Sequence, residues 1–207
     1  MADDGEHVAS PEETLRLIDQ QRAAAVKALR GDPLLLYTPW GVAWLLGFGT
    51  LFLRYGLDGV PYVPISPGAA LTVHLSLHVV AGAFVAIGIV RMNGQVRGES
   101  SAKGMMYGYA WFVGMMLMSV ISSRFSPALD PIEAGLMWGA VALLVVAILY
   151  MAGGALYGQW SMFFMGVWIA AVDAVGVMLG AGWHALLAAV LLGGGQIAAG
   201  ILLRSRA

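Results

Sequence analysis

The chain has 207 residues, of which 59% are hydrophobic, 28 are glycine and only 11% are charged. Water-soluble domains carry about 25% charged residues, so this composition excludes a soluble protein and indicates one that lies in a lipid bilayer. The net charge of −1 provides no basic surface for nucleic acid. The absence of cysteine excludes disulfides, thiolate metal sites and cysteine nucleophiles.

The beginning of the chain is polar and has no apolar core typical of a signal peptide, so residues 1–10 are expected to form a disordered tail. Ser10-Pro11-Glu12-Glu13 then has the pattern of a helix start, with serine as N-cap, proline at the first position and a glutamate that closes a capping box. The pattern predicts an amphipathic helix over residues 11–30. Such a helix suits the membrane interface, and its segment 11–29 could also dock a partner protein.

Six apolar stretches follow within a predicted membrane domain at residues 32–203, each close to the roughly 20 residues that cross about 30 Å of hydrocarbon. They are Leu34–Leu53, Gly68–Val90, Met105–Ile121, Ile132–Ala152, Trp160–Gly180 and Trp183–Leu203. Backbone polar groups inside lipid need internal partners, so each stretch is predicted to be an α-helix. The predicted fold class is all-α, a polytopic membrane protein with six transmembrane helices after one amphipathic helix.

The positions of lysine and arginine predict the orientation of these spans. Nine of the eleven fall before the first span, between the second and third spans, or after the last span, and the opposite side receives only Arg54 and Arg124. By the positive-inside rule both ends of the chain, including a short tail at 204–207, are expected in the cytoplasm. The predicted location is therefore the cytoplasmic (inner) membrane of a cell.

Four polar side chains lie where lipid disfavours them: His74 and His78 in the second span, Asp173 in the fifth and His184 at the start of the sixth. A rise of about 1.5 Å per residue places them all in the outer half of the membrane, from near the boundary to roughly 15 Å deep. An ionised aspartate inside a span is costly, so Asp173 is expected to face the bundle interior and to have a partner.

These residues allow three interpretations. They could line an ion, proton or substrate site, because the charge of imidazole changes near neutral pH. Asp173 could instead form a structural hydrogen bond with one histidine. A divalent metal held by His74, His78 and Asp173, with His184 as a fourth ligand, is a further alternative, although a His pair four residues apart is a weak signal by itself. No other cofactor is expected.

Gly193, Gly194 and Gly195 are adjacent inside the sixth span. Each weakens a helix by about 1 kcal/mol relative to alanine, so the triplet predicts a kink, a hinge or a very close neighbouring helix.

The chain lacks a phosphate-binding loop, a nucleophile elbow and a dinucleotide motif, so it is not predicted to be an enzyme. The function that the sequence favours is a small transporter or permease-like subunit in the lipid bilayer. The alternatives are a non-transporting regulatory or assembly subunit and, third, an intramembrane metal-dependent enzyme. A homo-oligomer, or a partner protein bound through helix 11–29, is compatible with the first two.

The polar segment Thr14-Leu15-Arg16-Leu17-Ile18-Asp19-Gln20-Gln21-Arg22, followed by Leu36-Tyr37-Thr38-Pro39-Trp40-Gly41, resembles a group of small, mostly uncharacterised actinobacterial polytopic membrane proteins with transporter-like or permease-like labels. The resemblance covers about the first fifty residues. It implies a protein of the inner membrane and assigns a role to no individual residue.

Overall fold

The computed structural model describes residues 10–29, 33–93 and 99–205, and every regular element in this part of the chain is a helix. Most of the two predicted tails, residues 1–9 and 206–207, lies outside the described residues. The all-α prediction is therefore confirmed for the part of the chain that the structure describes.

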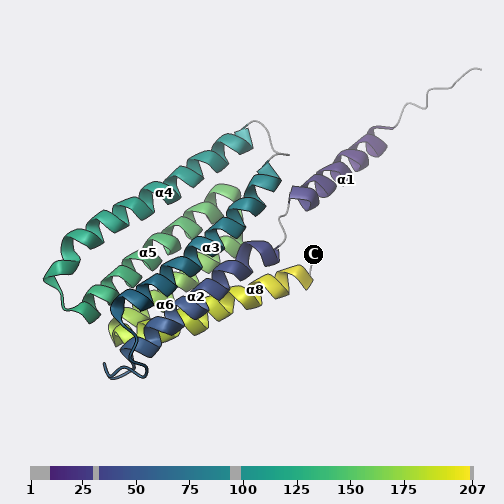
Figure 1. The fold of residues 1–207 in the computed structure, drawn as a ribbon. Helices are drawn as coiled ribbons and strands as arrows, with labels where there is room; N and C mark the ends of the chain where they lie inside the picture. Colours follow the sequence, from purple (N-terminus) through teal and green to yellow (C-terminus); the bar gives the residue numbers. More distant parts are fainter. Residues whose placement is uncertain (1–9, 30–32, 94–98, 206–207) are drawn as a thin grey trace, which may run out of the picture.

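The first helix, α1, spans Pro11–Leu29 as the capping pattern predicts. Ser10 Oγ accepts a hydrogen bond from the Glu13 backbone N–H at 3.2 Å, and Glu13 Oε2 accepts one from the Ser10 N–H at 3.3 Å. These two bonds form the predicted capping box. Figure 1 shows α1 apart from the other helices, and its side chains at residues 11–21 are all exposed.

The remaining helices form one bundle (Figure 1). Their bounds are α2 Pro33–Tyr55, α3 Pro67–Asn93, α4 Glu99–Phe125, α5 Pro131–Tyr157, α6 Trp160–Leu179, α7 Ala181–Leu187 and α8 Gly194–Ser205. A short 3₁₀ turn, η1 at Ser126–Ala128, precedes α5, and a π-helical segment, η2 at Ala188–Gly193, joins α7 to α8. Because α7, η2 and α8 follow one another without a gap, we call Ala181–Ser205 the C-terminal rod.

Five helical segments of the described residues are long and apolar enough to cross a membrane. They are Pro67–Gly88, Ala102–Ala128, Pro131–Tyr157, Trp160–Leu179 and Ala181–Ser205. They correspond to the last five of the six predicted spans. Helix α2 forms where the first span was predicted and has 23 residues, but it is not among the five.

Helix α2 lies between α3 and the C-terminal rod, and it is antiparallel to both. Gly47 faces His74 of α3 and Gly82 of α3 faces Trp40, so these two helices touch over several turns. On the other side Gly41 faces Gly193 of the rod, and Gly56, just after α2, faces Gly182. Helix α6 packs on α5 and α7, and α4 packs on α5 at the edge of the bundle.

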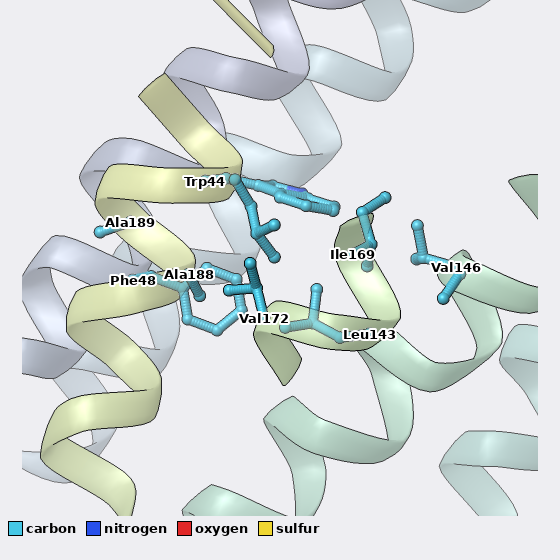
Figure 2. Packing of buried hydrophobic residues seen from close by; sticks show 10 residues of the cluster. Trp44, Phe48, Leu143, Val146, Ile169, Val172, Ala188 and Ala189 are labelled. Carbon is cyan, nitrogen blue, oxygen red and sulfur yellow. The ribbon is translucent and has the colours of Figure 1, made fainter. Parts of the chain in front are cut away.

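A cluster of buried apolar side chains fills the middle of the bundle, where α2, α5, α6 and the C-terminal rod meet (Figure 2). We call it the apolar plug; its members are Trp44, Phe48, Leu143, Val146, Ala147, Ile169, Val172, Ala188, Ala189 and Leu192. The small residues of the rod and of α5 let the helices approach closely around the two aromatic rings of α2.

Candidate functional site

Asp173 and His184 form a buried pair between α6 and α7. The two helices are joined by Gly180, whose φ of 95° lies in the region that favours glycine, so the chain reverses direction within one residue. The reversal brings Asp173 Oδ1 to 2.8 Å from His184 Nε2, within hydrogen-bond distance. The exposed fraction is 7% for Asp173 and 4% for His184.

Two glycines make the space that the His184 ring occupies. A Cβ at Gly139 of α5 would lie 3.0 Å from His184 Cε1, and a Cβ at Gly176 of α6 would lie 2.8 Å from His184 Cα. Both distances are shorter than ordinary van der Waals contact, so neither position tolerates a side chain while the imidazole stays in place. The position of His184 thus depends on glycines from two neighbouring helices.

Phe48 of α2 lies between His184 and a second pair of histidines on α3. Its ring is edge-on to His184 at 6.0 Å between centroids, and edge-on to His74 at 4.9 Å. Phe48 is 3% exposed and belongs to the apolar plug. An aromatic side chain of α2 therefore lies between the single imidazole of α7 and the two imidazoles of α3.

His74 and His78 lie one helical turn apart on α3, with ring centroids 4.2 Å apart. His78 Nδ1 is 2.7 Å from the backbone carbonyl oxygen of His74. Since a carbonyl oxygen only accepts, Nδ1 of His78 carries a proton, and its Nε2 is the nitrogen left to exchange one. His74 Nδ1 faces Gly47, is buried, and has no hydrogen-bond partner among the described residues. The Trp40 ring lies next to His78, with the two ring centroids 6.0 Å apart.

The four predicted site residues thus form two pairs, Asp173 with His184 and His74 with His78. The partner of Asp173 is His184, and Phe48 lies between this pair and His74. In the described ranges no three histidine or acidic side chains come close enough to hold a metal ion together.

A cavity of about 190 Å³ opens at the end of the bundle nearest to His184. Its lining includes Tyr55, Ile132 and the backbone of Gly180 and Gly182. The backbone N–H of His184 donates to the carbonyl of Gly180 at 2.9 Å, so the histidine lies one helical turn below the cavity wall.

The predicted triplet in the sixth span begins where the π-helical segment ends. Gly193 is the last residue of η2, and Gly194 and Gly195 begin α8. A Cβ at Gly193 would lie 2.9 Å from the carbonyl oxygen of Gly41, so the C-terminal rod and α2 come very close here. Hinge motion at these residues stays a prediction.

Comparisons with family models, with curated proteins and with solved structures gave no match to this chain. The site therefore has to be interpreted from its own geometry. Phe48 was not predicted as part of it, because a phenylalanine in an apolar span carries no signal in the sequence. The short connector at Gly180–Gly182 was the available signal for the pairing of Asp173 with His184, because it makes the two helices an antiparallel hairpin.

Proposed function

We propose that this chain is a small transporter or permease-like subunit in which the buried pair of Asp173 and His184 exchanges protons with the outer side of a cell membrane. The observation that carries the proposal is the 2.8 Å contact of these side chains between two segments that are each apolar enough to span a membrane. An ionisable residue in a span costs about 2.5–3.5 kcal/mol on insertion scales, and such residues commonly mark ion or proton routes.

The proposal includes α2 as a sixth span, with both ends of the chain in the cytoplasm. At 1.5 Å per residue, 23 residues extend about 34 Å, which is enough to cross the hydrocarbon. Contacts along α2 with α3 and with the C-terminal rod support this, since both neighbours contain candidate spans. The distribution of lysine and arginine supports the orientation. Helix α1 would then lie at the cytoplasmic interface.

In this function the outer cavity supplies protons to His184, and Asp173 stabilises its imidazolium form. The next acceptor is His74, on the far side of Phe48. A proton passes from a His184 nitrogen to a His74 nitrogen only after the Phe48 ring has moved aside, and His184 returns to its neutral form. Phe48 thus keeps the two pairs apart in the state described.

The purified full chain, reconstituted in liposomes that contain a pH-sensitive dye, tests this proposal with protons as the probe. An imposed membrane potential is expected to drive proton entry, and Asp173→Asn and His184→Gln are each expected to reduce its initial rate at least tenfold. Asp58→Asn, an exposed carboxylate in the α2–α3 connection, is the matched control and is expected to change nothing. Equal rates in folded Asp173→Asn and in the unmodified chain would overturn the proposal.

The exposure of helix α1 supports a second candidate function, that of a regulatory or assembly subunit that does not transport. Its described side chains are all exposed, and Leu15, Leu17 and Ile18 are 63%, 51% and 47% exposed. A stable partner that co-purifies with the full chain and is lost when residues 1–29 are removed, together with no proton flux in the unmodified chain, would favour this candidate.

A further inference from the structure

Gln196 of α8 is a buried amide to which the described protein offers no hydrogen bond. Its exposed fraction is 1%, and neither its Oε1 nor its Nε2 has a hydrogen-bond partner among the described residues. It lies on the buried face of the C-terminal rod, one turn after Leu192 of the apolar plug. The carboxamide can donate two hydrogen bonds through its nitrogen and accept through its oxygen. Gln196 therefore has more unsatisfied hydrogen-bonding atoms than any other buried side chain in the described part of the chain.

Thr38 of α2 has the same property at the same level of the bundle. Its Oγ1 is buried without a hydrogen-bond partner among the described atoms. Other helical hydroxyls of this chain bond to the carbonyl four residues earlier, as Thr50 does to Leu46 and Thr72 to Gly68, both at 2.8 Å. Thr38 does not make this bond, so its hydroxyl is available to another group.

The packing of α2 on α8 brings Thr38 and Gln196 to one level. A Cβ at Gly41 would lie 2.8 Å from the carbonyl oxygen of Gly193 and 2.9 Å from the backbone nitrogen of Ile197. Gln196 directly precedes Ile197, and Thr38 lies less than one turn before Gly41 on α2. The two side chains are therefore within about one helical pitch, roughly 5.4 Å, of each other along the bundle axis.

The amide of Gln196 and the hydroxyl of Thr38 thus lie at one level of the bundle, and a buried water molecule needs two to four polar partners. Inside lipid, no bulk water is available to form hydrogen bonds with an unpaired polar group.

We propose that Gln196 and Thr38 bind one or more internal water molecules in the half of the bundle that contains the start of α2 and the end of α8. This site is separate from Asp173 and His184, because Gln196 follows His184 by twelve residues, about 18 Å along a helix, with Leu192 of the apolar plug between them in the C-terminal rod. It does not depend on the proposed transport activity.

Solid-state NMR of the full chain in lipid, with ¹⁵N-labelled glutamine, tests the site through magnetisation transfer from water to the side-chain amide. Gln196→Leu assigns the signal, and Gln159, which is exposed, shows the full transfer. We expect the Gln196 amide to show clear transfer and Thr38→Val to reduce it several-fold. If the Gln196 side-chain amide shows no transfer from water while that of Gln159 does, the proposal is overturned. Should Gln196→Leu not fold, Gln196→Asn provides the assignment.

Discussion

The ring of Phe48 stands edge-on to the imidazole of His74, with their centroids 4.9 Å apart and their planes at 80°. The opposite neighbour of the same ring is His184. A positive ring edge can point at the face of a neighbouring ring, which stabilises this packing by about 0.5–1.5 kcal/mol. The Phe48 ring therefore contacts an imidazole of α3 and the imidazole of α7 at the same time.

Replacing Phe48 by leucine is expected to increase proton entry in the liposome assay, because the smaller side chain leaves room between His184 and His74. Removal of part of a buried ring also costs stability, about 1–3 kcal/mol, so unfolding in detergent must be measured beside the flux. Phe84→Leu on α3 is the matched control, since Phe84 is 57% exposed and lies away from the plug. A folded Phe48→Leu variant with unchanged flux would show that Phe48 does not separate the pairs.

The positions of the helices follow from the sequence, while the pairing of the polar side chains does not. Pro11, Pro67 and Pro131 each begin a helix, and Gly158 and Gly180 each follow the end of one, because proline and glycine act on the local backbone. Which histidine meets Asp173 depends on the rotation of each helix about its axis. That rotation is set by close contacts such as those of Gly139 and Gly176, which only the packed structure defines.

The π-helical segment and the proposed water site also could not be predicted from the sequence alone. Three adjacent glycines indicate a weakened helix, but they do not predict the π-helical register at Ala188–Gly193 or the closeness of Gly193 to Gly41 and Leu45 of α2. Gln196 is visible in the sequence as a polar residue in a span, whereas its lack of a protein partner depends on the side chains around it.

Gly176→Ala is expected to separate α6 from α7 and to weaken the pair of Asp173 and His184. The added Cβ would lie 2.8 Å from His184 Cα, a backbone atom that cannot move without moving the helix. Overpacking of this kind costs about 1–3 kcal/mol, which thermal unfolding in detergent can measure. Gly88→Ala, where a Cβ meets no atom within 4 Å, is the control and is expected to leave stability unchanged or slightly raised. Equal unfolding temperatures for the two variants would contradict the prediction.

Two neighbouring glycines of the triplet are expected to respond in opposite directions. At Gly193 a Cβ would lie 2.5 Å from the backbone nitrogen of Leu45, so Gly193→Ala should destabilise the protein by about 1–3 kcal/mol. At Gly194 a Cβ meets nothing within 4 Å, so Gly194→Ala should raise helix stability by up to about 1 kcal/mol. Unfolding temperatures of the two variants, compared with the unmodified chain, check this. Destabilisation by Gly194→Ala would indicate instead that flexibility at the triplet is required.

The absence of cysteine makes the proposed crossing of α2 directly measurable. Ser10→Cys and Asp58→Cys place one thiol before α1 and one after α2, and both positions are exposed. If α2 crosses the membrane, a charged thiol reagent that cannot enter the cell labels Asp58→Cys in intact cells and labels Ser10→Cys only after the membrane is permeabilised. Ser205→Cys at the end of the C-terminal rod should behave as Ser10→Cys does, since six spans return the chain to the side where it began. If Ser10→Cys and Asp58→Cys are labelled from the same side, α2 does not cross the membrane and the chain has five spans.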